Sequence, residues 1–263
     1  MKTAGVDIGS LTGKALILED HNIMSWSLIP TNPDPNVTVK KAIDIALEKA
    51  HLSISDMDYV VSTGYGRLTV PFAQRNITEI SCHAKGAHWF FPEVRTILDM
   101  GGQDCKAIRC DDTGKVTNFA MNDKCAAGAG RSMEVMADLL QLPLDNLGQL
   151  SLEIVEAEVP ISNTCVVFAK SEALSHLRRG KNKSDILAGV CEALATRVYS
   201  LMKRVGIESE FVISGGIAKN IGIVKRLTDK TGLTPRISFE PQIVGALGAA
   251  LFAQEILERE RQT

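Results

Sequence analysis

Two cysteines, Cys125 and Cys165, each follow a run of small or polar residues at the start of a predicted helix. Cys125 lies in NDKCAAGAGR, residues 122–131, and Cys165 lies in ISNTCVVFAKSE, residues 161–172. The positive partial charge at a helix N-terminus lowers the pKa of a thiol and favours the thiolate, which is the form that binds metal. These two thiols are therefore the candidate metal ligands. The other four cysteines are interpreted as small core residues: Cys82, Cys105, Cys110 and Cys191.

A second chemical pattern is a hairpin whose tip is suited to phosphate, in VDIGSLTGKALILED at residues 6–20. Asp7 ends a predicted strand, where its carboxylate could hold Mg²⁺ or the waters of that ion. Glycines in the following turn let backbone N–H groups approach phosphate oxygens, while hydroxyl donors and a lysine add polarity and charge. We call this the first hairpin. Its candidate nucleotide-binding residues are Gly9, Ser10, Leu11, Thr12, Gly13 and Lys14.

The same pattern returns ninety-two residues later as LDMGGQDCKAIRCDD, residues 98–112, which we call the second hairpin. Asp7 matches Asp99, and Lys14 matches Lys106, with further matches of Gly9 to Gly101, Ala15 to Ala107 and Asp20 to Asp112. Chance agreement between two common hairpins is the alternative. A repeat of this length favours two related halves, each with a sheet that begins with a phosphate hairpin, facing one another across a cleft.

Two further glycine motifs follow predicted strands. GGIAKN, residues 215–220, comes between a strand and a helix, where a glycine pair lets a base or sugar approach the backbone. Its alternative is a plain tight turn. TGYGR, residues 63–67, is either a turn or a surface that faces a partner, and we favour the turn.

The elements that position these motifs alternate between strand and helix patterns, which predicts an α/β fold. Beyond the hairpins we expect strands at 23–29, 58–62, 116–121, 210–214 and 235–239, and a loop at 143–150. Helices are expected at 37–51, 81–91, 128–140, 166–179, 184–205 and 244–259. His83 and His88 on the second helix lack a companion ligand at metal spacing, so structural roles are expected. The halves divide as residues 1–94 and 95–263.

Composition excludes several classes of function. A net charge of −2 and 45% hydrophobic content are typical of a globular protein and give no electrostatic reason to bind nucleic acid or a membrane surface. No apolar run approaches the length of a membrane span, and a strand pattern directly after the start leads us to expect no signal peptide. Six cysteines without CxxC pairs indicate reduced thiols, so we expect a cytoplasmic location.

In their order along the chain, the two hairpins and residues 215–220 resemble the phosphate-1, phosphate-2 and adenosine motifs of the acetate and sugar kinase, Hsp70 and actin superfamily. Together with NDKCAAGAGR, SNTCVVFAKSE and TGYGR, the pattern is similar to the activators of 2-hydroxyacyl-CoA dehydratases and the ATP-binding subunits of benzoyl-CoA reductases. The resemblance implies an actin/Hsp70/sugar-kinase-like fold with two related halves around a nucleotide cleft. We refer to residues 215–220 as the adenosine motif.

The resemblance also implies ATP/ADP, Mg²⁺ and one [4Fe–4S] cluster per homodimer, with Cys125 and Cys165 of each chain as ligands. In our hypothesis, Asp7 and Asp99 organise the magnesium ion and its waters, and Gln103 or Asp104 orients the attacking water. Phosphates would lie on the first hairpin and on Gly101 and Gly102. The adenosine would lie near Gly215, Gly216, Asn220 and Gln242.

The implied activity is ATP-driven transfer of an electron to a separate dehydratase or reductase component, with a low-potential ferredoxin or flavodoxin as the reductant. The chain departs from the family pattern at Ala129, where threonine is frequent, and at Lys170, where a carboxylate is usual. Neither change touches a cysteine. Lys170 places a positive charge near the implied cluster, which bears on the identity of the partner.

Three alternatives use the same residues differently. The chain could be a small-molecule kinase with structural cysteines, a filament- or scaffold-forming ATPase, or a carrier of a cluster built within one chain by recruiting Cys105 or Cys110. The odd spacing of Cys105 and Cys110 points their side chains to opposite faces of a strand, which opposes joint ligation. Iron content separates these cases, with about two irons per chain for a shared cluster, about four for a self-contained one and none for a kinase.

Overall fold

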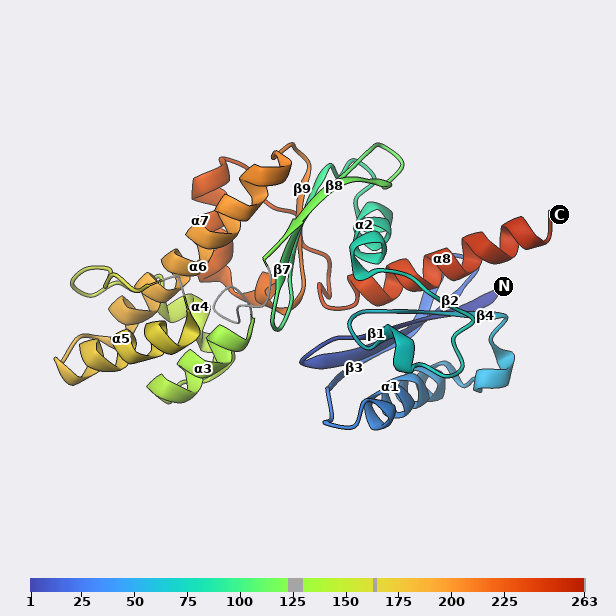
Figure 1. Cartoon of the computed structure of the whole chain (residues 1–263), viewed down its shortest axis with the longest axis horizontal. Helices are drawn as coiled ribbons and strands as arrows, with labels where there is room; N and C mark the ends of the chain where they lie inside the picture. The colour runs from blue at the N-terminus through green and yellow to red at the C-terminus, as the bar shows by residue number, and fades with distance from the viewer. Residues whose placement is uncertain (123–129, 163–164, 263) are drawn as a thin grey trace. The chain divides into compact units, whose positions relative to one another are not determined.

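The computed structural model describes residues 1–122, 130–162 and 165–262, and the chain packs as two compact units (Figure 1). The first unit contains Met1–Val94, Cys110–Thr117 and Ser238–Thr263, and the second contains Arg95–Arg109 and Asn118–Ile237. The division into residues 1–94 and 95–263 stays a prediction.

The sheet of the first unit has the strand order β3-β2-β1-β4-β5. Its strands are β1 (Lys2–Ile8), β2 (Thr12–Glu19), β3 (Asn22–Pro30), β4 (Tyr59–Thr63) and β5 (Arg75–Asn76). The first three strands form an antiparallel meander, and β4 lies parallel to β1. The predicted hairpin is therefore present, and β1 carries a parallel neighbour on its other edge.

Helices cover both faces of this sheet (Figure 1). Side chains alternate along a strand, so Val6 and Ile17 pack with α1 (Pro35–Ala50), while Leu16 and Leu18 pack with α8 (Val244–Glu260). Helix α2 (Glu79–Phe90) packs against α8 in turn, with the backbone of Cys82 directly beside Gly248. The small residues of α8 permit this close approach.

The sheet of the second unit repeats this arrangement with the order β8-β7-β6-β9. Its strands are β6 (Thr96–Met100), β7 (Cys105–Cys110), β8 (Val116–Met121) and β9 (Phe211–Ser214). Strand β6 is antiparallel to β7 and parallel to β9, as β1 is to β2 and β4. The internal repeat predicted from the two hairpins is therefore confirmed as a repeat of strand order.

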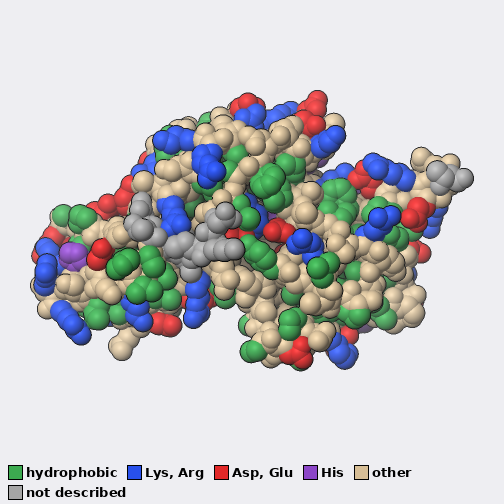
Figure 2. Space-filling model, in the orientation of Figure 1, with side chains coloured by type: hydrophobic (Ala, Val, Ile, Leu, Met, Phe, Trp, Pro, Cys, Tyr) green, Lys and Arg blue, Asp and Glu red, His purple; other side chains and the backbone are tan. Residues whose placement is uncertain are grey.

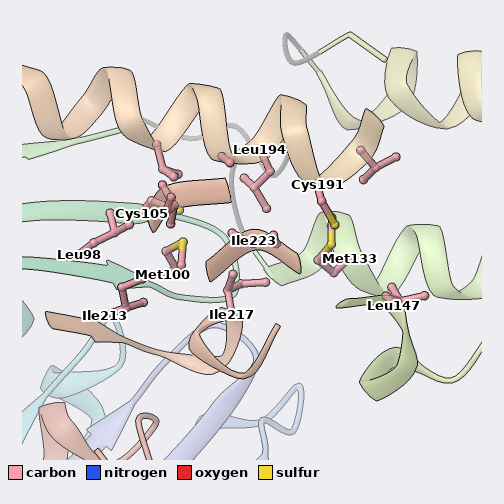
Figure 3. Packing of buried hydrophobic residues seen from close by; sticks show 14 of the residues in the cluster. Leu98, Met100, Cys105, Met133, Leu147, Cys191, Leu194, Ile213, Ile217 and Ile223 are labelled. Carbon is pink, nitrogen blue, oxygen red and sulfur yellow. The ribbon is translucent and has the colours of Figure 1, made fainter. Parts of the chain in front are cut away.

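Helices of the second unit share one hydrophobic core with its sheet (Figure 3). Leu98 and Met100 of β6 meet Met133, Leu194 and Ile223 from three different helices. Helices in this unit are α3 (Gly130–Leu140), α4 (Leu147–Leu150), α5 (Val166–Arg178), α6 (Lys183–Val205) and α7 (Ile221–Thr231). Helix α3 and the first strand of the second hairpin, β6, therefore belong to one core.

Two expectations about local structure were wrong. Residues 143–150 are not a plain loop, because the short helices η4 (Leu144–Asn146) and α4 carry Leu147 into the core. Residues 235–239 do not form a strand, because Arg236 makes only an isolated bridge to Val212. Pro235 lacks an N–H group and cannot extend that pairing.

The remaining predicted helices and strands are present within a few residues of their expected limits, among them α6 and α8. The other short 3-10 helices are η1 (Ile54–Asp56), η2 (Arg67–Thr69) and η5 (Gly216–Lys219). No helix in the described ranges is both long and apolar enough to cross a membrane. Acidic and basic side chains are interspersed over the face shown in Figure 2, as the small net charge suggests.

Candidate functional site

The first hairpin places a carboxylate and an ammonium group side by side next to its tip. Asp7 and Lys14 are cross-strand partners, and Lys14 Nζ lies 3.1 Å from Asp7 Oδ2. Both side chains are almost fully buried. The turn between them is closed by a hydrogen bond of 3.0 Å that Gly9 N donates to Thr12 O. The backbone N–H of Gly9 thus serves the turn itself.

The second hairpin has the same construction. Asp99 and Lys106 are cross-strand partners, and Lys106 Nζ lies 3.6 Å from Asp99 Oδ2. Gly101 N donates to Asp104 O at 3.0 Å and closes the turn. Asp104 adds a second carboxylate, with Lys106 Nζ 2.6 Å from its Oδ2. Because all three side chains are buried, their charges act in a medium less polar than water.

Backbone N–H groups at both tips are available to an anion. Within the described part of the chain, Ser10 and Leu11 in the first hairpin donate no backbone hydrogen bond to a protein acceptor. The same is true of Gly102 and Gln103 in the second hairpin. Successive N–H groups of this kind bind phosphate oxygens well. Each hairpin tip by itself therefore suits a phosphate group.

A glycine in a left-handed conformation presses against each hairpin aspartate. Gly64 follows β4 with φ +84°, and a Cβ there would lie 2.5 Å from both Asp7 Oδ1 and Ile8 O. Gly215 follows β9 with φ +83°, and a Cβ there would lie 2.9 Å from Asp99 Oδ1 and 2.3 Å from Met100 O. Only glycine suits such a position.

The TGYGR loop is thus the counterpart in the first unit of the glycine pair in the second. The sequence interpretation favoured a plain turn at residues 63–67 and missed this equivalence. Thr63 pairs with Asp7 and Ser214 pairs with Asp99, so each glycine occupies the same register. A hydroxyl residue followed by glycine at the end of a strand was the available signal.

Gly245 and His83 lie close to Asp7, and the sequence analysis did not assign either residue to the site. A Cβ added at Gly245 would lie 3.1 Å from Asp7 Oδ2 and 2.9 Å from His83 Nε2, so the buried imidazole lies near the carboxylate. His83 was expected to be structural, and its helix gives no indication that it lies near the first hairpin. In the second unit, Ser214 Oγ donates to Asp99 Oδ1 at 3.3 Å.

The adenosine motif is built around the start of α7. Gly216 begins the 3-10 turn η5, and the Asn220 side chain caps α7 by accepting a hydrogen bond of 3.0 Å from Ile223 N. Asn220 Nδ2 also contacts Met133 Sδ at 3.9 Å. In the first unit, Gln242 precedes α8 and its backbone N donates to Glu240. Nucleotide contacts of these residues stay predictions.

Cys165 is the N-cap residue of α5, which confirms the predicted position of this thiol at the start of a helix. Its side chain is half-buried. Val167 and Phe168, which follow Val166 in the first turn of α5, are exposed. Lys170 is exposed on the same helix. Cys125, Ala129 and the neighbouring residues 123–129 lie outside the described residues, as do residues 163–164.

The other cysteines are core residues, as expected. Burial raises the pKa of the Cys82 thiol to about 12, and it also raises the pKa of Cys105 and Cys191. Buried Cys110 donates its thiol to Val94 O at 3.3 Å. Raised pKa values disfavour the thiolate that iron requires. No group of three or more His, Cys, Asp or Glu residues converges on a metal position among residues 1–122, 130–162 and 165–262.

The structure therefore brings together, in the second unit, Asp99, Asp104, the glycines of the second hairpin and Gly215. In the first unit it groups Asp7 with Lys14 and Gly64. Gln103 differs from Asp104 because its side chain is exposed, while that of Asp104 is buried.

Comparison with known proteins gives a consistent picture. Residues 4–253 match the BadF/BadG/BcrA/BcrD ATPase family. The chain is 42% identical over 261 residues to the activator of lactoyl-CoA dehydratase from Anaerotignum propionicum, covering 99% of this chain and 100% of that protein. It also resembles the solved activator of the 2-hydroxyisocaproyl-CoA dehydratase from Clostridium difficile with bound ADPNP. That match has a TM-score of 0.93 and 40% identity, and covers 100% of this chain and 98% of the other.

More distant structures share the fold alone. A ROK hexokinase from Thermus thermophilus matches with a TM-score of 0.54 and 16% identity, over 98% of this chain and 100% of the other. The predicted actin/Hsp70/sugar-kinase-like α/β fold is confirmed.

Proposed function

Because the chain belongs to the BadF/BadG/BcrA/BcrD ATPase family, we propose that it uses ATP hydrolysis to drive one low-potential electron onto a separate 2-hydroxyacyl-CoA dehydratase or a related CoA-ester reductase component. One observation carries this proposal. Cys165 stands at the N-terminus of a helix in the same unit that holds the second hairpin and the adenosine motif. A kinase of this fold has no need for a half-buried thiol there.

Each hairpin offers its own backbone donors to phosphate. Ser10, Leu11, Gly102 and Gln103 offer N–H groups to the phosphate oxygens, and Lys14 adds a positive charge to the first hairpin. We place the adenosine beside Gly215 and Gly216, where η5 begins. A relative of known structure has ADPNP bound, which supports ATP/ADP as the ligand of this chain.

Carboxylates beside the hairpin tips suit a hard cation. Asp7 and Asp99 supply the oxygen ligands that Mg²⁺ prefers, directly or through its waters. Asp104 orients the attacking water in our proposal, because its carboxylate is buried and fixed by Lys106, whereas Gln103 is exposed. These groups would stabilise the charge that develops on the transferred phosphoryl group.

Iron ligation is assigned to Cys125 and Cys165. A [4Fe–4S] cluster takes four thiolates, so two cysteines per chain imply a homodimer in which both chains contribute ligands about a two-fold axis. When bound, such a cluster supplies a one-electron carrier. The N-terminus of α5 favours the thiolate of Cys165 and places positive partial charge toward an anionic group.

The electron acceptor is a separate protein component, and a low-potential ferredoxin or flavodoxin is the proposed donor. Exposed Val167 and Phe168 lie in the first turn of α5, within three residues of Cys165, so this end of the helix offers an apolar surface near the proposed redox centre. Lys170 adds a positive charge on the same helix. These features support a partner that approaches at Cys165.

Iron and sulfide analysis after anaerobic purification tests the proposal. We expect about two irons per chain in the wild-type dimer and loss of iron in Cys125→Ser and in Cys165→Ser. Cys82→Ala is the matched control, because Cys82 is buried and is not a ligand in this scheme. An iron-free wild type that still hydrolyses ATP after anaerobic reconstitution would overturn the electron-transfer role and favour the kinase alternative.

A further inference from the structure

Thr31 lies directly after β3 and bonds to both ends of the tip of the first hairpin. Its hydroxyl donates to Gly9 O at 3.0 Å, and its backbone N donates to Leu11 O at 2.9 Å. The pairing of β2 with β3 reaches Thr12 and Pro30, so these two bonds continue the contact between the strands beyond their last pair. One residue therefore holds the tip at Gly9 and at Leu11.

The bond to Gly9 O also fixes the direction of a donor that is assigned to phosphate. The carbonyl of Gly9 and the N–H of Ser10 belong to one peptide group, which is planar and trans. The two groups point in opposite directions, so a hydroxyl that holds the carbonyl on one side aims the N–H to the other. Among the described residues no acceptor takes the Ser10 N–H, which is therefore available to a phosphate oxygen.

The peptide group that joins Gly9 to Ser10 depends on this bond for its orientation. In the described part of the chain, the Thr31 hydroxyl makes the one hydrogen bond of that peptide group. Glycine adopts a wider range of backbone conformations than other residues, so the peptide plane turns over more readily here than elsewhere. After such a rotation the carbonyl oxygen faces the phosphate, and the two negatively polarised groups repel each other. Thr31 thus acts where the backbone of the tip is least restrained.

The segment that carries Thr31 is itself held by α1. Asn32 N donates to Thr38 Oγ1 at 2.8 Å, and Thr38 is a buried residue in the first turn of α1. The methyl group of Thr38 lies against β2, since a Cβ added at Gly13 would lie 2.4 Å from Thr38 Cγ2. Because α1 contacts both the residue after Thr31 and the strand after the tip, the Thr31 hydroxyl is a fixed donor.

We propose that Thr31 is a positioning residue for the nucleotide, whose hydroxyl orients the peptide group between Gly9 and Ser10 so that the Ser10 N–H faces the phosphate. This inference rests on the proposed function, since it assumes that the first hairpin binds a nucleotide phosphate. Thr31 itself makes no contact with the nucleotide in this scheme. Loss of its hydroxyl therefore weakens the binding of ligands that carry phosphate and leaves the binding of adenosine unchanged.

A pair of substitutions at Thr31 isolates the hydroxyl. Thr31→Val removes the hydroxyl but keeps the branched shape and the N–H that is bonded to Leu11 O. Thr31→Ser keeps the hydroxyl and removes the methyl group. Ser25→Ala is the control for a hydroxyl lost elsewhere in β3, because Ser25 Oγ donates to Ala46 O at 2.5 Å, away from the tip.

The readout is the affinity of the full-length chain for two ligands, measured by calorimetry for ADPNP with Mg²⁺ and by NMR titration for adenosine. In Thr31→Val we expect the Kd of ADPNP to rise about 5- to 10-fold, the effect of about one hydrogen bond, and the Kd of adenosine to stay the same. In Thr31→Ser and Ser25→Ala we expect both Kd values of the wild type. Rescue by serine separates orientation of the peptide group from a general loss of stability.

Other outcomes overturn the inference in distinguishable ways. A folded Thr31→Val protein that binds ADPNP as tightly as wild type refutes the role of Thr31, whereas the iron analysis of the wild type still decides the proposed function. An equal loss of affinity in Thr31→Ser or in Ser25→Ala also refutes it, because the hydroxyl of Thr31 is then not the cause. If Thr31→Val fails to fold, Thr31→Ala takes its place and the same outcomes apply. A wild type that binds no ADPNP would overturn the inference together with the ATP-dependent part of the proposed function.

Discussion

The first and second hairpins share strand order, register and turn closure, yet their loop carbonyls have different partners. Gly9 O accepts a hydrogen bond of 3.0 Å from the hydroxyl of Thr31, directly after β3. Its counterpart Gly101 O accepts from Gly130 N at the start of a helix. The loop of the first hairpin is therefore bonded to a residue directly after a strand of its own sheet. The loop of the second hairpin is bonded to the helix that follows Cys125, a candidate iron ligand.

Charge distinguishes the two hairpins as well. Thr12 of the first hairpin stands where the second has Asp104, so Lys14 meets one carboxylate and Lys106 meets two. Among the described residues, the first hairpin has one buried carboxylate beside its lysine, and the second has two. We infer that both hairpins serve phosphate and the cation, and that the second hairpin also serves the attacking water through Asp104.

The largest effect that tests this comparison is on stability. Lys106→Met removes the ammonium group that lies beside two buried carboxylates, and we expect it to lower the free energy of unfolding by about 3–5 kcal/mol. Lys14→Met leaves only Asp7 unpaired and should cost less. Urea unfolding measures both, with exposed Lys225→Met as the control that changes little. Equal losses at Lys14 and Lys106 would contradict the charge difference.

The next effect is on catalysis. Asp104→Asn should lower the kcat of ATP hydrolysis by about 100-fold or more, because a fixed carboxylate that orients the attacking water is lost. Gln103→Ala should have a much smaller effect, since that side chain is exposed. Steady-state phosphate release at saturating ATP measures both. The opposite ranking would assign the water to Gln103.

The smallest expected effect concerns the glycine that lies against the hairpin aspartate in each unit. Gly64→Ala and Gly215→Ala each force a side chain into a left-handed conformation, at a cost of about 1–2 kcal/mol, and add a clash with a backbone carbonyl. Gly232→Ala is the control, because its φ is also positive, +70°, but nothing lies within 4 Å of the added Cβ. Thermal unfolding should rank both hairpin variants below Gly232→Ala. A Gly64→Ala protein as stable as Gly232→Ala would remove the equivalence between the units.

Much of the fold could be predicted because it follows from local patterns. The helices α6 and α8 and the strands of both hairpins show clear periodicity, and the match of Asp7 with Asp99 revealed the repeat. The strand expected at 235–239 was wrong, since alternating polar and apolar residues after a proline do not show whether the edge of a neighbouring strand is free to pair with them. Residues 143–150 were misjudged because one buried leucine decided their conformation.

The candidate site was only partly predictable from sequence. Position along the chain was enough to place Cys165 at a helix start and to place Asp7 and Lys14 in one hairpin, since both depend on spacing within one element or one hairpin. Gly64 and His83 were not assigned to the site, because they reach Asp7 from other elements. A contact between elements that are distant in the sequence cannot be read from the spacing of residues within either element.

By itself, the sequence determined the family, the two hairpins and the two cysteine contexts, because residue type and spacing specify strand register and helix starts. Only the tertiary structure decided which groups complete these motifs. Gly101 O bonds to Gly130 and Gly9 O to Thr31, although the two loops look alike as strings of residues. The physical reason is that a backbone carbonyl accepts whichever donor the packing of distant elements brings within reach.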